Sequence, residues 1–176
     1  MTAPRWIVRT LVRRTFLGRL ARSSLAVGAM AAPVRRARAQ TEGRGRVLGF
    51  DHVAAPMRDT EAMVAFYRSL GFKVNEGRGI CSVHFGDHKI NFHRPHVWED
   101  PATTLRAPAA QPPCGDFCFV WEGGEASLLR TLRDADADVI AGPVERTGGK
   151  DGGTARGTSR YVRDPDGNLL EFIVYP

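Results

Sequence analysis

The stretch RYVRDPDGNLLEFIVY, residues 160–175, is the part of the chain from which its fold is inferred. The segment Asp164-Pro165-Asp166-Gly167-Asn168 holds a proline and a glycine between small polar residues, which is typical of a turn. The apolar run that follows is rich in strand formers, so the stretch predicts a β-hairpin. Side chains alternate across a strand, which puts Glu171 among apolar neighbours. Because burial penalises an ionised carboxylate, Glu171 requires a cation, a metal or strong hydrogen-bond donors nearby.

An earlier segment, FGDHKINFH at residues 85–93, repeats this layout of a turn, a short polar link and a strand. Counting from the start of each turn matches His93 with Glu171. The segments GFDHVAA (49–55) and GDFCFVW (115–121) match each other as well, which pairs His52 with Asp116. We therefore predict two similar half-domains, each with one candidate ligand on its first strand and one on its last.

The remaining patterns predict the same order of elements in both halves. Apolar residues at helical spacing, started by Asp59 or Thr60 and stopped by Gly71, predict a helix in the first half, and residues 126–137 predict its counterpart. Strands are predicted at residues 48–55, 73–76, 80–85 and 89–93, and at 116–121, 139–144, 159–163 and 169–175. Each half is thus a βαβββ unit of the α+β class. The glycine-rich residues 146–157 are predicted to form a mobile loop and a candidate lid.

Two imidazoles and two carboxylates on strands are ligands that suit one divalent ion of Fe, Mn, Ni, Co or Zn. The predicted metal ligands are His52, His93, Asp116 and Glu171. A single strand histidine is more often a surface or hydrogen-bonded residue, so the metal prediction rests on the matched positions in the two halves. Arg146 and Arg160 are candidates for holding an anionic group of a substrate, although solvated surface arginines are the commoner case.

The charge of the chain is concentrated at its start. The formal net charge is +6, but the first 41 residues contain no Asp or Glu, and nine of the 25 basic residues lie within the first 40. The rest of the chain carries 16 basic and 19 acidic residues. Its basic residues are scattered, which argues against nucleic-acid binding. Cys81 and Cys118 are predicted to be small buried residues.

Residues 1–39 are interpreted as an export signal or basic leader. Arg13-Arg14-Thr15-Phe16-Leu17 resembles a twin-arginine motif, and Ala37-Arg38-Ala39 resembles a signal-peptidase site. The apolar run between them is too short for a stable membrane span. Export to the periplasm or medium is predicted, and the alternatives are a cytoplasmic or organelle-targeted protein. Residues 40–47 are then a linker, 48–93 module one, 94–113 a linker rich in proline, and 114–176 module two.

Three segments of the chain form a recognisable set: FDHV (50–53), GPVERTG (142–148) and SRYVRDPDGNLLEF (159–172). Together they resemble the vicinal oxygen chelate superfamily, also called the glyoxalase/bleomycin resistance/extradiol dioxygenase superfamily. The likeness covers residues 48–176 and is nearest to the small glyoxalase-domain-5-like, single-domain members. It implies paired βαβββ modules in a half-barrel around a metal that chelates vicinal oxygens of a small substrate. It also implies a homodimer.

The resemblance leaves the reaction open. A glyoxalase-like lyase or isomerase is expected, with Glu171 or Asp116 as the general base. Asp116 departs from the family pattern, because His, Gln or Glu is usual there, and its shorter side chain could bind through water or not at all. His52, His93 and Glu171 alone would favour an iron-dependent extradiol-type dioxygenase. A metal-free protein that sequesters a ligand, as the bleomycin-resistance members do, is the third possibility.

Overall fold

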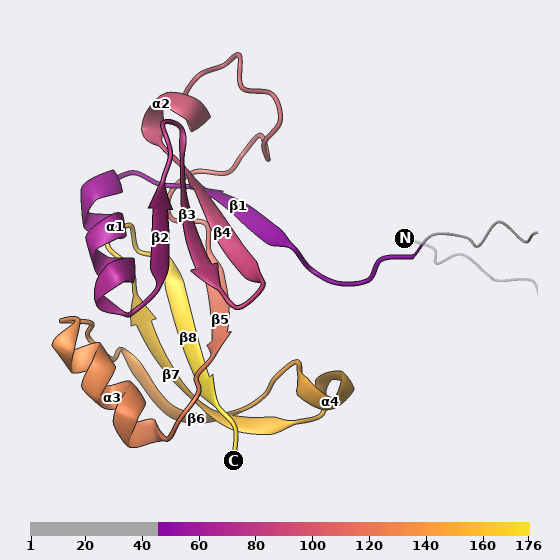
Figure 1. The fold of residues 1–176 in the computed structure, drawn as a ribbon, viewed down its shortest axis with the longest axis vertical. Coiled ribbons are helices and arrows are strands. Elements are labelled where there is room, and N and C mark those ends of the chain that lie inside the picture. The colour runs from indigo at the N-terminus through magenta and orange to yellow at the C-terminus, as the bar shows by residue number, and fades with distance from the viewer. Residues whose placement is uncertain (1–45) are drawn as a thin grey trace, which may run out of the picture. The chain divides into compact units, whose positions relative to one another are not determined.

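Two four-stranded sheets and four helices make up the computed structural model, which describes residues 46–176 (Figure 1). The export signal predicted for residues 1–39 lies outside the described residues. The first module and the linker contain β1 (His52–Pro56), α1 (Thr60–Ser69), β2 (Lys73–Glu76), β3 (Ile80–Phe85), β4 (His88–His93) and α2 (Pro95–Trp98). The second contains β5 (Asp116–Val120), α3 (Glu125–Asp134), β6 (Ala141–Thr147), α4 (Lys150–Gly153), β7 (Arg156–Arg163) and β8 (Leu169–Val174).

The two modules have the same topology. The strand order is β1-β4-β3-β2 in the first sheet and β5-β8-β7-β6 in the second. In each sheet the first strand of the module pairs in parallel with the last, and the other neighbours are antiparallel. The predicted α+β class and the two βαβββ modules are confirmed. Asp59 caps α1 through its side chain, which accepts from the Ala62 N–H, as the sequence predicted.

The glycine-rich residues 146–157 do not form the long loop that was predicted. Strands β6 and β7 extend into this segment, with Thr147 paired to Arg156, and the one-turn helix α4 connects them. Backbone pairing between the two strands therefore takes up most of the segment, and the predicted lid is reduced to residues 148–155.

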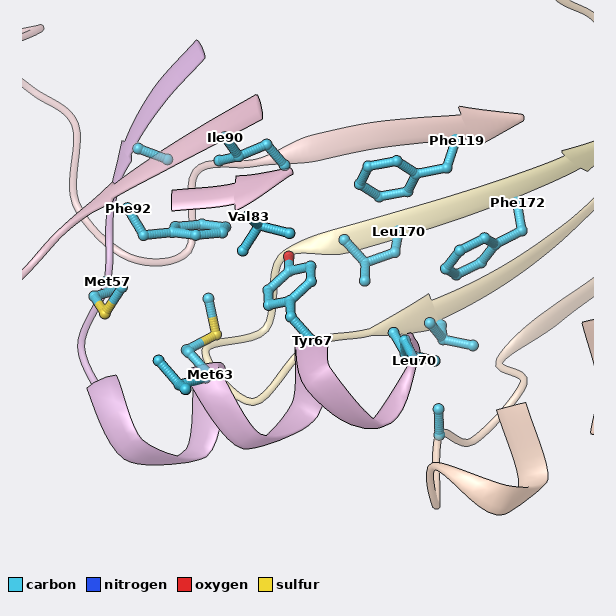
Figure 2. Packing of buried hydrophobic residues seen from close by; sticks show 14 of the residues in the cluster. Met57, Met63, Tyr67, Leu70, Val83, Ile90, Phe92, Phe119, Leu170 and Phe172 are labelled. Atoms are coloured by element: carbon cyan, nitrogen blue, oxygen red, sulfur yellow. The ribbon is translucent and has the colours of Figure 1, made fainter. Parts of the chain in front are cut away.

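One hydrophobic core is shared by the two modules, and Tyr67 lies inside it with 0% of its surface exposed. Its ring meets Phe72 edge-on and is tilted against Phe92. Figure 2 shows Tyr67 reaching from α1 towards Val83 and Phe92 of the first sheet and Leu170 of the second. Aromatic side chains contribute large buried areas, so this contact holds the modules together.

The turn that follows β7 connects the modules through hydrogen bonds. Asp164 accepts a hydrogen bond from the Tyr67 hydroxyl at 3.1 Å. Asp166 accepts from the backbone N–H groups of Arg58 and Asp59, where the chain enters α1. Asn168 accepts from the N–H groups of Cys114 and Gly115, just before β5. The polar residues of the sequence's most conspicuous turn are therefore structural, and each joins the turn to a different segment.

Candidate functional site

Strand pairing decides which polar side chains share a face in module one. On β1 and β4, His52 is paired with Lys89, Ala54 with Asn91, and Pro56 with His93. These residues lie on the face opposite the core, because the alternate residues Ala55, Ile90 and Phe92 are buried in it. His52 and Asn91 are therefore diagonal neighbours on the open face of the first sheet.

Module two repeats this arrangement with different side chains. Asp116 is paired with Leu169 and Cys118 with Glu171, so Asp116 and Glu171 are the diagonal neighbours on the open face of the second sheet. The register makes Asp116 the equivalent of His52, as predicted. It makes Glu171 the equivalent of Asn91, and His93 the equivalent of Ile173.

The predicted match between His93 and Glu171 is therefore wrong by two positions. Counting from the start of each turn assumed that Gly86 and Asp164 are equivalent. The register instead makes Gly86 the equivalent of Asp166, because Lys89 and Leu169 are the partners of His52 and Asp116. The turns also differ in length, with two residues (86–87) between β3 and β4 and five (164–168) between β7 and β8. Because side chains alternate with a period of two, the error kept the correct face and displaced the residue along it.

The four predicted metal ligands are not gathered in one place within the chain. Among residues 46–176, no group of three or more His, Cys, Asp or Glu side chains could hold a metal ion. His52 and His93 are separated by four residues along the paired strands, or about 13 Å at the rise of a β-strand. Asp116 and Glu171 belong to the other sheet. The four predicted ligands thus lie as two separate pairs, His52 with His93 on the first sheet and Asp116 with Glu171 on the second.

His52 is held by its sequence neighbour. Its Nδ1 lies 2.5 Å from Oδ1 of Asp51, and this hydrogen bond is the main reason that the pKa of Asp51 is lowered. An ionised Asp51 accepts this hydrogen bond from Nδ1, so Nε2 is the ring nitrogen that faces away from it and is available as a ligand in the neutral imidazole. A histidine oriented in this way by a carboxylate is the usual arrangement of a metal-binding imidazole.

Glu171 is held by two neighbours on the same face. The Ser159 hydroxyl on β7 donates to its Oε1. The Cys118 thiol lies beside it, and burial, followed by the charge of Glu171, raises the pKa of this thiol to about 12. The thiol is therefore protonated at neutral pH. Cys118 as a whole residue is exposed, unlike the buried Cys81, so the prediction that both are buried holds for Cys81 alone.

The two candidate arginines lie on opposite faces of the second sheet. Arg146 donates from Nε to the Tyr161 hydroxyl at 2.8 Å, and Tyr161 is paired with Glu171, so Arg146 is on the face of the candidate ligands. Arg160 is paired with Phe172 of the core and forms an ion pair with Glu125 of α3. This ion pair, on the helix-covered face, keeps Arg160 away from the candidate ligands.

A cavity of about 560 Å³ lies along β5, between the modules. Its walls are mainly aromatic, including Phe72, Phe85, Phe119 and Trp121. Cys118 lines it as well and links it to Glu171. This volume lies in the range of small-molecule sites. Strand alternation in the sequence could have singled out Cys118, whereas the placement of Asn91 and Ser159 needed the register.

Proteins with sequences similar to this chain include two that are about one third identical to it. The glyoxalase domain-containing protein RDO1 of Mycosarcoma maydis is 34% identical over 130 residues, which cover 73% of this chain and 69% of that protein. The virulence protein STM3117 of Salmonella typhimurium is 32% identical over 127 residues, 71% of this chain and 83% of that protein.

Solved structures share the fold. The crystal structure of STM3117 superposes with a TM-score of 0.65 at 30% identity, covering 75% of this chain and all of that one. An integron cassette protein from V. cholerae gives a TM-score of 0.64 at 29% identity, covering 75% and 98% of the two chains. A lactoylglutathione lyase from Agrobacterium tumefaciens, with a TM-score of 0.55 at 18% identity, covers 73% and 95% and shares the fold alone.

The family model described as "Glyoxalase/Bleomycin resistance protein/Dioxygenase superfamily" matches residues 49–172, which span both modules. The resemblance stated from the sequence is thereby confirmed. With its two βαβββ modules and these relatives, the chain belongs to the glyoxalase/bleomycin resistance protein/dioxygenase superfamily.

Proposed function

We propose that this protein is a metal-dependent enzyme that acts on a small oxygenated molecule, as a glyoxalase-like lyase or isomerase. The observation that carries the proposal is the matched register of two polar pairs, His52 with Asn91 and Asp116 with Glu171. A role in packing does not explain two such pairs on faces turned away from the core. The family model, which names both glyoxalases and dioxygenases, supports enzymatic chemistry of this type.

The residues present fit a divalent first-row metal. His52 offers a free Nε2, and Asp116 and Glu171 offer carboxylate oxygens, which are ligands for Fe, Mn, Ni, Co or Zn. Asp51 and Ser159 orient His52 and Glu171 as hydrogen-bonded neighbours of metal ligands do. Asn91 is the weakest member, because its amide oxygen carries no charge. His93 is left outside this set, and the experiment below tests that choice.

A site built from both pairs requires a second copy of the chain, and we propose a homodimer. Among residues 46–176 the strands that carry His52 and Asp116, β1 and β5, are both edge strands, with hydrogen-bonding groups on one side that no other described strand pairs with. Phe50 and Val120 beside them are 60% and 57% exposed, which is unfavourable for large apolar side chains left in water. Pairing β1 of one copy with β5 of the other would cover both edges and bring the two polar pairs together.

The chain's own groups then have distinct tasks. When bound, the metal acts as a Lewis acid towards vicinal oxygens of the substrate. The cavity beside β5 holds the apolar part of the molecule and excludes water. Glu171, oriented by Ser159, takes a proton from the carbon next to a carbonyl. Arg146, fixed by Tyr161, supports an anionic group on the same face.

Metal content tests the proposal. The full-length chain is purified without chelator, and bound metals are measured by elemental mass spectrometry in the wild type and in His52→Ala, Asp116→Ala, Glu171→Gln and His93→Ala. We expect about one equivalent in the wild type, most of it lost in His52→Ala and Glu171→Gln and retained in His93→Ala. Loss in His93→Ala with retention in His52→Ala would overturn the ligand set.

The identity of the metal separates the remaining functions. Iron, together with ring cleavage of catechols, would favour the extradiol-type dioxygenase instead of the lyase. Nickel, zinc, cobalt or manganese would support the lyase or isomerase. A wild-type protein without metal would leave the ligand-sequestering protein as the better account, with the cavity along β5 as its binding site.

We also propose that residues 1–39 direct export through the twin-arginine route. The support is the sequence alone, namely Arg13-Arg14 followed by an apolar run and Ala37-Arg38-Ala39. Cell fractionation of the full chain is expected to find it outside the cytoplasm, and Arg13→Lys with Arg14→Lys is expected to retain it inside. Equal distribution of both proteins would contradict export by this route. Along residues 46–176 no helix is long and apolar enough to span a membrane.

A further inference from the structure

A small cavity lies at the end of the first sheet where β1 and β4 end, and the linker after β4 forms its outer wall. In Figure 1, α2 and the loop that follows it lie at this end of the sheet. Trp98 of α2 fixes the linker, because its Nε1 donates to the backbone oxygen of Met57 at 2.8 Å. The linker then brings Arg106 to the cavity, opposite Pro56 and His93.

Arg106 lines this cavity and carries one donor that has no acceptor. Its Nη1 is used by its own loop, donating to the backbone oxygens of Ala107 and Pro108 at 3.2 and 3.1 Å. Its Nε is buried and has no hydrogen-bond partner among the described residues, a property shared only with Nε of Arg94 in that part of the chain. Buried donors are nearly always satisfied, and a guanidinium stays charged, so a missing acceptor is expected beside Arg106.

The surroundings of Arg106 point to an anion as that acceptor. The other residues that line the cavity are alanines, Pro56, His93 and Trp98, with no Asp or Glu among them. The positive charge is therefore not balanced inside the cavity. The volume is about 40 Å³, slightly more than the ~30 Å³ that one water occupies in the liquid, which suits a group of two or three heavy atoms.

We infer that this cavity is a binding site for the carboxylate group of a small organic acid, held by Arg106 with His93 as a second polar neighbour. Guanidinium groups bind planar carboxylates through parallel N–H donors, and a carboxylate matches the size and charge of the site. The site is on the open face of the first sheet, which also carries Asn91 and His52. An acid bound there extends over the same face as the candidate metal ligands.

This inference goes beyond the proposed function and does not depend on a metal. It uses none of His52, Asp116 and Glu171. A protein that fails to bind metal could still bind a carboxylate at Arg106, and the reverse also holds. The test is therefore made on protein treated with chelator, so that acetate cannot bind through a metal.

The probe is acetate, compared with its neutral analogue acetamide and with chloride at equal ionic strength. Nitrogen-15 NMR follows the Arg106 Nε–H signal of the full-length protein, which is assigned by its loss in Arg106→Lys. We expect a saturable shift of this signal with acetate and none with acetamide or chloride. The His93 ring signal reports binding in the variants. Arg106→Gln is expected to weaken acetate binding at least about tenfold, and Arg106→Lys less, because lysine keeps the charge without the planar fork.

Arg130→Gln is the matched control, because Arg130 is an exposed arginine on α3 in module two. It is expected to leave acetate binding unchanged. A wild-type Nε–H signal that does not shift with acetate, or that shifts equally with acetamide, would overturn the inference and assign the cavity to water. Acetate binding of equal strength in Arg106→Gln would overturn it as well. If Arg106→Gln fails to fold, Arg106→Lys and the wild-type titration decide the outcome.

Discussion

The two modules place side chains at the same register positions but differ in chemistry and in how they are connected. Module one carries His52 and the neutral Asn91 on its open face, whereas module two carries the carboxylates of Asp116 and Glu171 at the equivalent positions. Module one closes β3 and β4 with a two-residue turn. Module two uses a five-residue turn whose side chains reach into module one. The repeated backbone therefore determines the positions at which a ligand side chain can lie. Which of these positions carries a charged ligand, and which turn connects the modules, differs between the two halves because their side chains differ.

The largest effect is expected where the equivalent helices differ. Tyr67 of α1 and Leu132 of α3 occupy corresponding buried positions, but only Tyr67 adds a hydrogen bond, to Asp164 of the other module. Tyr67→Ala is expected to lower the free energy of unfolding by about 4 kcal/mol and Leu132→Ala by about 3 kcal/mol. Urea denaturation measures both. Tyr67→Phe isolates the hydroxyl, with an expected loss of about 1 kcal/mol. No loss in Tyr67→Phe would contradict a connecting role for this bond.

The next largest effect is expected in the turn before the last strand of each module. Asp166 accepts from two backbone N–H groups of module one, while Asp87 in the short turn is exposed. Asp166→Ala leaves both donors without their acceptor and is expected to cost about 2 kcal/mol of unfolding free energy. Asp87→Ala, the matched control, is expected to change it by less than about 0.5 kcal/mol. Equal effects of the two variants in urea denaturation would remove the distinction between the turns.

A substitution that gives module one a carboxylate at the position of Glu171 in module two tests how the two polar pairs differ. Ser82 already donates to Oδ1 of Asn91 at 2.7 Å, as Ser159 donates to Glu171. Asn91→Glu therefore replaces the one neutral side chain of the two polar pairs that is not an imidazole, and places a third carboxylate where a hydroxyl donor is available. We expect metal affinity, measured by competition with a chromogenic chelator, to rise about tenfold.

Asn75→Glu is the control for Asn91→Glu, because Asn75 lies on β2 of the same sheet, paired with Ser82. It is expected to leave the metal affinity nearly unchanged. A similar rise in both variants would mean that general negative charge is responsible, and no rise in Asn91→Glu would exclude Asn91 from the ligand positions.

The smallest predicted effect concerns the thiol beside Glu171. Burial is the main reason that the pKa of Cys118 is raised to about 12, and the Glu171 charge comes second. In chelator-treated protein with Cys81→Ser and Cys114→Ser, Glu171→Gln is expected to lower the Cys118 pKa while leaving it above the ordinary thiol value. Thiolate absorbance at high pH measures this. An unchanged pKa would show that the two side chains do not interact, and Glu122→Gln, an exposed site after β5, serves as the control.

The sequence by itself predicted the class, the two βαβββ modules and the correct faces of the strands at residues 89–93, 116–121 and 169–175. These follow from local patterns: apolar spacing around Met63 and Tyr67, the cap at Asp59, and alternation along residues 169–174. The match of His52 with Asp116 also followed, because both residues begin strands of equal length with parallel partners.

Only the tertiary structure decided which residues are equivalent along a strand and which polar groups are structural. A register depends on hydrogen bonds between strands and on turn length, so one short turn moved the equivalent of Glu171 from His93 to Asn91. The Asp164–Asn168 turn has the sequence of a local turn motif, yet its side-chain acceptors receive hydrogen bonds from backbone N–H groups more than 50 residues away. Arg106 likewise comes from an irregular linker, and no periodic pattern places it beside His93. Local periodicity determines faces, whereas pairing and packing between distant segments determine sites.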